Sequence, residues 1–169
     1  VNNISIAQKV QTGLTEADIV YETEVEGGIT RLMAVFKDIS KVEKIGTIRS
    51  ARYPYIDLAM GHGAIYVHHG QDKTYAKPHL RDTQTFAVGE NNAGVRIRNE
   101  GLASEHTLYG YGKKIWEWFE KKNYDTKLKS VENWQTFASE DKKVEFSDLA
   151  DTVTVKFSNA YTSVFKYDA

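Results

Sequence analysis

The chain contains no cysteine among its 169 residues. This absence excludes disulfide bonds, catalysis by a thiolate and zinc sites built on cysteine. It does not decide the redox compartment, because a domain without cysteine is compatible with either side of a membrane. Proline is scarce as well, with 2 residues, so each proline is an informative marker of where a helix begins or ends.

The chain also lacks an excess of charge of either sign and any long apolar run. Its 22 Lys and Arg residues balance 23 Asp and Glu residues, which gives a net charge of -1. Binding to nucleic acid without sequence preference needs a basic excess, so we expect no nucleic-acid partner. No apolar run approaches the roughly 18 residues of a membrane-spanning helix, and no signal peptide is visible. Because the first residues, VNNISIAQ, do not resemble a natural start, we expect a leader or anchor before Val1 in the full-length protein.

Hydrophobic residues make up 41% and charged residues 27% of the chain, which is typical of a globular protein with a buried core. The length suits one ordinary domain, or one domain and part of another. We predict an α+β fold in which a mixed sheet combines an N-terminal β-hairpin, a β-α-β unit and flanking helices. The predicted domains are an N-terminal α/β domain at 1–128 and the start of a β-rich domain at 129–169.

The clearest local pattern is IVYETEVEGGITRLMAVF at 19–36, where two alternating runs flank Gly27-Gly28. A glycine pair accepts the positive φ angles of a tight turn, so this segment predicts a hairpin with a two-residue loop. That register places Glu24 opposite Arg31 on a face that also carries Glu22 and Glu26. The simpler interpretation of this face is a solvated surface with one cross-strand ion pair. The predicted core face carries Ile19, Tyr21, Thr23, Val25, Leu32, Ala34 and Phe36.

The segment KIGTIRSARYPYIDLAMGHGAIYVHHG at 44–70 predicts a strand, a helix and a second strand. The strands occupy 44–49 and 64–68, and the helix begins at Pro54, where proline is tolerated in a first turn. This order is typical of a right-handed crossover between parallel strands. Further along, the pattern predicts a helical segment at 71–80, a short strand at 85–88, an edge strand at 95–99 and a helix at 105–123.

Arg49 and Arg52 lie where the first of these strands gives way to the helix. In open α/β sheets, ligands bind at the carboxyl ends of strands, and two guanidinium groups can hold a phosphate, sulfate or carboxylate. The alternative is that both arginines pair with Glu22, Glu24 or Glu26 and tie the sheet to the helix. Both interpretations stay open at this point.

The adjacent His68 and His69 point to opposite faces of a regular strand, so they do not readily share a metal ion. A zinc site would need His62, His79 or His106 with a carboxylate, and we predict neither a metal site nor a cofactor. Ser50 lies between the two arginines, but the sequence places no base beside it. Because hydrolase, nucleotide-binding and metalloprotease motifs are absent, no catalytic residue is assigned.

Three segments carry a resemblance to a known family: GLTEADIVYETEVEGGITRLMAVF, IGTIRSARYPYIDLA and EHTLYG. Together they resemble the YerB-like lipoprotein family, whose shared region is catalogued as a domain of unknown function, over most of 1–123. Thr107 departs from the pattern, which has asparagine there, so no role is assigned to that position. The signature motifs E-G-G-x-T-R and R-S-A-R are matched here by Glu26, Gly27, Gly28, Thr30, Arg31, Arg49, Ser50 and Arg52.

The resemblance implies a membrane-anchored, extracytoplasmic protein of Gram-positive bacteria, held by a lipid on an N-terminal cysteine that this chain does not contain. It brings no known reaction, substrate or cofactor. The leading hypothesis is therefore a cell-envelope binding or scaffold domain whose three arginines converge on one polar cleft. Its expected partner is an anionic envelope ligand or an envelope protein, and the membrane is reached only through the anchor. The predicted ligand-binding residues are Glu24, Glu26, Arg31, Arg49, Ser50, Arg52 and His68.

Two alternatives accompany this hypothesis. The first is a protein-interaction module that uses exposed edge strands or the helix around Trp116 and Trp118, with Trp118 the better candidate for exposure and Trp116 and Phe119 expected in the core. The second is an enzyme acting on phosphate-containing envelope polymers, with Glu24 or Glu26 as a base or metal ligand.

Overall fold

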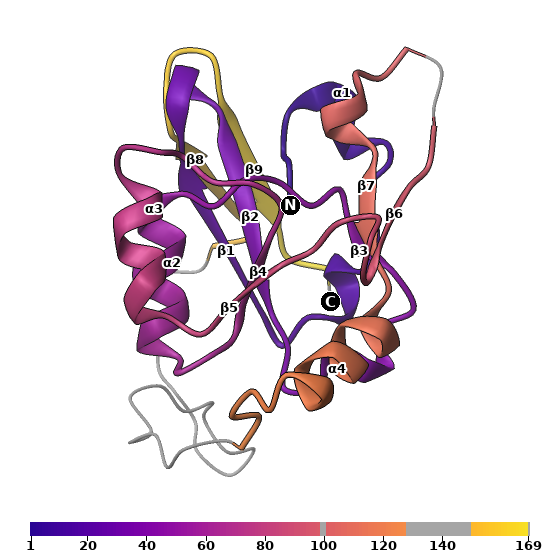
Figure 1. Ribbon diagram of the computed structural model, residues 1–169. Helices are drawn as coiled ribbons and strands as arrows, with labels where there is room; N and C mark the ends of the chain where they lie inside the picture. The colour runs from indigo at the N-terminus through magenta and orange to yellow at the C-terminus, as the bar shows by residue number, and fades with distance from the viewer. Residues whose placement is uncertain (99–100, 128–149, 169) are drawn as a thin grey trace, which may run out of the picture.

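The computed structural model describes residues 1–98, 101–127 and 150–168, and its strands form four small sheets (Figure 1). The sheets have the orders β1-β2, β3-β7-β6, β4-β5 and β8-β9. Helices and strands are both well represented, which confirms the predicted α+β class. The elements are α1 (Ser5–Gln8), β1 (Ile19–Glu24), β2 (Thr30–Val35), β3 (Ile45–Gly46), α2 (Tyr53–Gly61), β4 (Tyr66–His68), α3 (Ala76–His79), β5 (Thr85–Ala87), β6 (Gly94–Arg96), β7 (Leu108–Gly110), α4 (Gly112–Lys121), β8 (Thr152–Lys156) and β9 (Thr162–Lys166).

The hairpin of β1 and β2 is confirmed, but the predicted register is wrong by one residue. The loop is the three-residue turn η2 (Glu26–Gly28), which the Val25 N–H closes by donating to the Ile29 carbonyl at 2.8 Å. Thr23 therefore lies opposite Arg31, where the two-residue loop had placed Glu24. Because successive side chains point to opposite faces, this slip places Arg31 and the buried Met33 on the face of Tyr21 and Thr23, away from the glutamates.

The helix predicted from Pro54 is confirmed as α2, but the predicted parallel pairing of 44–49 with 64–68 is wrong. The two-residue strand β3 pairs antiparallel with β7, whereas β4 pairs in parallel with β5. The parallel unit is thus β4-α3-β5, one step further along the chain. The segment after β3 leaves its sheet and reaches the segment after β4 through one parallel bridge, between Ala51 and Gln71.

The helix predicted at 71–80 forms later, as α3. One carboxylate oxygen of Asp72 accepts hydrogen bonds from the backbone N–H groups of Thr74, Tyr75 and Ala76. This arrangement satisfies the free donors ahead of the helix, so the preceding residues form a turn. The short strand expected at 85–88 is confirmed as β5. The edge strand predicted at 95–99 is confirmed as β6, which lies at the edge of its sheet. Asn99, the last residue of the predicted range, lies outside the described residues.

The segment 105–123, predicted as one helix, is divided into three elements. A single turn, η5 (Ser104–His106), leads into β7, and only the second part is the helix α4. Gly110 belongs to β7, where it lies opposite Ile45 on one side and Gly94 on the other. The apolar residues of this segment are compatible with helical spacing, but strand pairing on both sides of 108–110 overrides that local preference.

Two hydrophobic clusters form the core. One lies between α4 and the sheet β3-β7-β6, and the other lies between the β1-β2 hairpin and α2. Phe119 is buried as predicted, whereas Trp116 is half-buried. Trp118 is half-buried too, against the expectation of exposure, because its ring packs 6.1 Å from that of Phe86. The first cluster comprises Val42, Ile45, Ile48, Phe86, Val88, Ala93, Leu108, Ile115 and Phe119.

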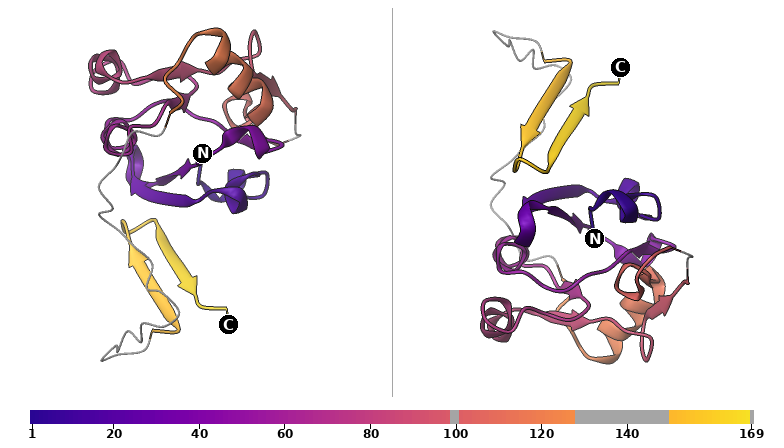
Figure 2. Two further views of the ribbon diagram at one scale, coloured as in Figure 1. Left: turned by 90° about the horizontal axis from the view of Figure 1, so that it is seen from below. Right: turned by 90° about the horizontal axis from the view of Figure 1, so that it is seen from above.

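The strands β8 and β9 form an antiparallel hairpin beside β1 and β2 (Figure 2). The Ser158 hydroxyl donates to the Gly28 carbonyl at 2.6 Å, and the Ser163 hydroxyl donates to Glu22 at 2.9 Å. The predicted domain boundary at 128–129 lies outside the described residues and stays a prediction. In the described part of the chain, no helix has the length and apolar character needed to cross a membrane.

Candidate anion-binding cavity

A cavity of about 310 Å³ lies between β2, α2, β4 and α4. Every residue from Arg31 to Lys37 contributes to its lining, as do Arg49 and Ser50. The remaining wall is largely apolar and includes Ile48, Ile65, Val67, Ile115, Trp116 and Phe119. The cavity therefore combines two guanidinium groups with a mostly hydrophobic surface.

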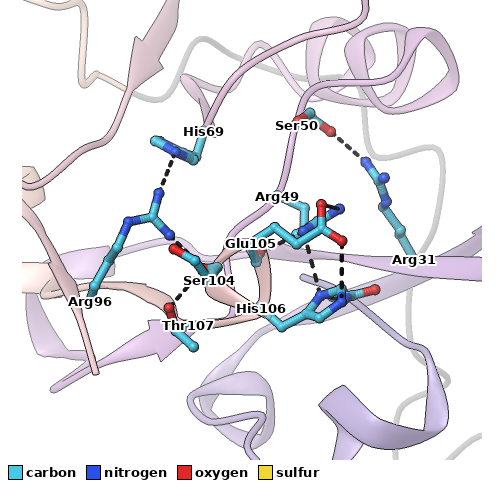
Figure 3. Close-up of polar contacts among 10 residues, drawn as sticks. Arg31, Arg49, Ser50, His69, Arg96, Ser104, Glu105, His106 and Thr107 are labelled. Atoms are coloured by element: carbon cyan, nitrogen blue, oxygen red, sulfur yellow. Dashed lines mark hydrogen bonds and ion pairs between the residues drawn. The ribbon is translucent and has the colours of Figure 1, made fainter. Parts of the chain in front are cut away.

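Arg31 is the most unusual charged residue of this cavity, because its side chain is buried, with 6% exposed. Its Nη1 donates to the Ser50 carbonyl at 2.7 Å, while its Nε is buried without a hydrogen-bond partner (Figure 3). No carboxylate among the described residues forms an ion pair with it. Burial first, and then the neighbouring Arg52 and Arg49, lower the pKa of Arg31 to about 10. A buried cation of this kind is unfavourable unless an anion compensates it.

Arg49 lines the same cavity and is anchored from the other side by the turn η5. Its Nη1 donates to the Glu105 carbonyl at 2.6 Å, and its Nη2 contacts the Glu105 carboxylate at 3.2 Å (Figure 3). That carboxylate is exposed, which weakens the pair through screening by water. The Nε of Arg49 is buried and has no partner in the described part of the chain. Arg49 thus retains an unsatisfied donor beside Arg31.

Arg52 and the two predicted glutamates lie elsewhere. The Arg52 Nε is hydrogen-bonded to the Glu26 carboxylate, and its Nη1 donates to the Ala51 carbonyl at 3.0 Å. Arg52 and Glu26 are absent from the described lining of the cavity, and so is Glu24, which lies exposed at the end of β1. The alternative to anion binding was that the arginines pair with glutamates of the hairpin. The structure shows this pairing for Arg52, which connects the β1-β2 hairpin to the start of α2.

His68 is buried, and both of its ring nitrogens are occupied. Nδ1 lies 2.7 Å from the Gly70 carbonyl, so it donates, and Nε2 lies 2.8 Å from the Thr85 hydroxyl. His68 is not among the described residues that line the cavity. Its contacts are those of a neutral imidazole that joins β4 to β5.

This arrangement predicts a pH dependence of stability. Burial first, and then the neighbouring His69, lower the pKa of His68 below its ordinary value. The unfolded chain therefore takes up a proton at a pH where the folded chain does not, and the free energy of unfolding falls as the pH drops through about 6.5. Urea denaturation measures the free energy of unfolding at pH 7 and at pH 5. Between these two pH values, this free energy is expected to fall clearly less for His68→Gln than for the unmodified protein. An equal fall in both proteins would contradict this assignment.

A second group of polar residues, which was not predicted to bind a ligand, lies next to Arg49 (Figure 3). Arg96 donates to the Ser104 carbonyl at 2.6 Å and contacts the His69 Nε2 at 3.1 Å. The Thr107 hydroxyl donates to the same carbonyl at 2.7 Å and closes the turn η5. The motif EHTLYG contains two of the three residues of this turn, but the long-range contacts of the turn to Arg49 are formed only in the folded chain.

His106 completes the surroundings of Arg49. Its Nδ1 lies 2.6 Å from the Asn2 amide and 3.4 Å from the Arg49 Nη1, while its Nε2 faces Glu105 at 3.4 Å. Burial first, and then Arg49, lower the pKa of His106. Within the ranges that the structure describes, no three histidine or acidic residues are grouped closely enough to hold a metal ion.

Comparisons with known proteins agree with the resemblance found in the motifs. The family model described as "Protein of unknown function (DUF3048) N-terminal domain" matches residues 1–125. The protein named "Putative lipoprotein YerB" from Bacillus subtilis (strain 168) is 34% identical over 137 residues, which cover 79% of this chain and 40% of that relative. A crystal structure of YerB protein from Bacillus subtilis matches 99% of this chain and 55% of its own, with a TM-score of 0.74 and 30% identity. The predicted YerB-like relationship is thereby confirmed, and the chain belongs to the DUF3048 family.

Proposed function

We propose that this chain is a binding domain for an anionic ligand of the cell envelope, which it holds in the cavity lined by Arg31 and Arg49. The observation that carries the proposal is the buried Arg31 guanidinium, which has an unbonded Nε and no carboxylate partner among the described residues. Binding an anion there would supply the negative charge that the buried guanidinium group lacks among its described neighbours.

The proposed location is extracytoplasmic. Its support is that the relative from Bacillus subtilis is named as a lipoprotein, together with the family membership of this chain. A lipid anchor would keep the domain at the membrane surface, where anionic envelope components are within reach. Because the chain covers 40% of that relative, the activity of the whole protein would also depend on further segments.

Calorimetric titration with inorganic pyrophosphate tests the proposal. Each charge-assisted hydrogen bond from a guanidinium contributes about 1.5–3 kcal/mol, so we expect Arg31→Met to weaken binding by roughly tenfold to a hundredfold. The matched control is Arg81→Met, which removes an exposed arginine outside the cavity lining and is expected to leave the affinity unchanged. Equal affinities for Arg31→Met and the unmodified protein would overturn the proposal.

A second variant tests the contribution of Arg49. Glu105→Gln removes the carboxylate that now contacts the Arg49 Nη2 and would otherwise repel a second anion. Glu105→Gln is therefore expected to bind the anion more tightly. Because the carboxylate is 61% exposed, the gain in binding free energy is limited to about 1 kcal/mol, or roughly fivefold in affinity. The same titration measures it, and a weaker affinity of Glu105→Gln would show that Glu105 orients Arg49 for binding.

A second candidate function is protein interaction through β8 and β9. Several apolar side chains of this hairpin are exposed, among them Val164 and Phe165. Exposed apolar patches of this kind are typical of protein contacts. Crosslinking of the lipid-anchored protein in membranes tests this candidate: loss of a crosslinked partner on Phe165→Ser would support it, and an unchanged pattern would contradict it.

A further inference from the structure

We infer that the outer face of helix α4 binds a membrane surface, and that its partner is a lipid bilayer with anionic head groups. The surface consists of Lys113, Lys114 and Lys121 on α4 and of Lys122, which directly follows the helix. We call these four residues the lysine face. None of them lines the cavity, so this surface is separate from the proposed anion site. The choice of a membrane rests on the proposed extracytoplasmic location, whereas the surface itself follows from the structure of α4.

The lysine face points away from the core. Ile115 and Phe119 are buried in the first hydrophobic cluster and mark the inner side of α4. Lys113 and Lys121 are exposed and share the opposite side with Glu117, because residues four positions apart lie on the same side of a helix. In both views of Figure 2, α4 and the β8-β9 hairpin lie at opposite ends of the molecule. An extended surface can therefore approach α4 without meeting that hairpin.

The charges of the lysine face are not compensated. None of its four lysines forms an ion pair within the described part of the chain. Instead, the Lys121 and Lys122 ammonium groups lie 4.7 and 5.8 Å from the ring centre of Trp118. Four lysines accompany two glutamates in this segment, although the whole chain has a net charge of -1. The face is therefore a basic surface on a slightly acidic protein.

Two of these lysines are placed where the helix itself disfavours a cation. The N-terminus of a helix carries a partial positive charge, so acidic residues are favourable in the first turn and basic residues are not. The first turn of α4 contains Lys113 and Lys114 and no acidic residue. Lys121 and Lys122, at the other end, are favourable for the helix and alone would need no partner. The first pair therefore indicates an anionic partner outside the fold.

An anionic bilayer matches this face in charge and in the aromatic residues beside it. Each lysine close to an anionic membrane raises the affinity roughly fivefold. Trp118 lies beside Lys121 and Lys122, and the Tyr111 ring lies 5.2 Å from the Lys114 ammonium group. Tryptophan and tyrosine are enriched at membrane–water interfaces. Because the apolar side of α4 belongs to the core, the contact is a surface contact that salt weakens.

Sedimentation with lipid vesicles tests the inference on the chain itself. Vesicles of phosphatidylglycerol and phosphatidylcholine are expected to bind the protein at low salt, whereas vesicles of phosphatidylcholine alone are not. Lys113→Gln/Lys114→Gln is expected to weaken binding to the anionic vesicles by roughly twentyfold. The matched control Lys73→Gln/Lys77→Gln removes two exposed lysines in and before α3, with the same change in net charge. This control is expected to change the affinity by less than about twofold, because charges beyond a Debye length are screened.

Thermal denaturation and pyrophosphate titration of the same variant separate membrane binding from folding and from the anion site. Because Lys113 and Lys114 oppose the helix dipole, Lys113→Gln/Lys114→Gln is expected to melt at or above the temperature of the unmodified protein. Its affinity for pyrophosphate is expected to stay unchanged, because neither lysine lines the cavity. A loss of affinity restricted to vesicles supports the membrane surface independently of the proposed anion site.

Three results would overturn the inference. The first is equal affinity for anionic and uncharged vesicles, or binding to neither at low salt. The second is an equal loss in Lys113→Gln/Lys114→Gln and in Lys73→Gln/Lys77→Gln, which would show attraction by net charge without a preferred face. The third is a lowered melting temperature of Lys113→Gln/Lys114→Gln, since the two lysines would then stabilise the fold.

Discussion

The Arg31→Met variant is expected to be more stable than the unmodified protein when no ligand is present, by about 1–3 kcal/mol in the free energy of unfolding. Burial and two neighbouring arginines lower the pKa of Arg31 to about 10, a depression that corresponds to roughly 3 kcal/mol against the charged form. At pH 7 the guanidinium is charged in both states, so the folded state carries this penalty. Loss of the hydrogen bond to the Ser50 carbonyl offsets about 1 kcal/mol of the gain.

Urea denaturation at pH 7 measures this effect, and two variants control for it. Arg31→Lys keeps a buried cation and is therefore expected to show no gain in stability. Arg81→Met removes an exposed charge and is expected to change the free energy of unfolding by less than about 0.5 kcal/mol. A loss of more than about 1 kcal/mol in Arg31→Met would mean that the guanidinium stabilises the fold, which contradicts the role assigned to it.

The Gly112→Ala variant is expected to lose about 3 kcal/mol or more of stability, because helix α4 begins where two backbone carbonyls approach it closely. A Cβ atom at this position would lie 2.0 Å from the Ile39 oxygen and 2.3 Å from the Val42 oxygen. Both are backbone atoms, so they cannot rotate away as a flexible side chain would. The first turn of α4 would have to shift, and with it Ile115 and Phe119, which belong to both the core and the cavity wall.

Gly61 provides the matched control for this variant, since it also lies in a helix but has no atom within 4 Å of an added Cβ. Gly61→Ala is expected to be neutral or to gain up to about 1 kcal/mol, because alanine restricts the unfolded chain more than glycine does. Thermal denaturation followed by circular dichroism compares the two variants. A midpoint for Gly112→Ala equal to that of Gly61→Ala would show that α4 is not held against Ile39 and Val42.

The comparison of sequence and structure explains why the hairpin could be predicted and its register could not. Both Gly27 and Gly28 have positive φ angles, as expected, but Glu26 joins them in the loop. A glycine pair is compatible with loops of two or three residues, and the choice depends on how both strands pack against the rest of the fold. This single residue decides whether Arg31 lies beside solvated glutamates or inside the cavity.

Other differences also arise from long-range contacts. The apolar spacing of 105–123 was compatible with one helix, and only the pairing of β7 with β3 and β6 shows that 108–110 is a strand. In the same way, the motif R-S-A-R predicted charged groups at the start of α2, and the sequence offered Glu26 but not Glu105 as a partner for them. Arg49 contacts Glu105, which lies far along the chain, whereas Arg52 is bound to Glu26. Local patterns locate such residues, and the fold determines which of them line a cavity.

A crystal soaked with selenate tests the central claim most directly, because selenate is an oxyanion like phosphate and selenium is located by its anomalous scattering. The expected result is a selenium peak inside the cavity, with oxygen atoms within hydrogen-bond distance, about 2.7–3.2 Å, of the Arg31 and Arg49 nitrogens. A cavity without selenium, while Arg31 keeps its present contacts, would contradict the account. So would a selenium peak confined to exposed lysine or arginine side chains.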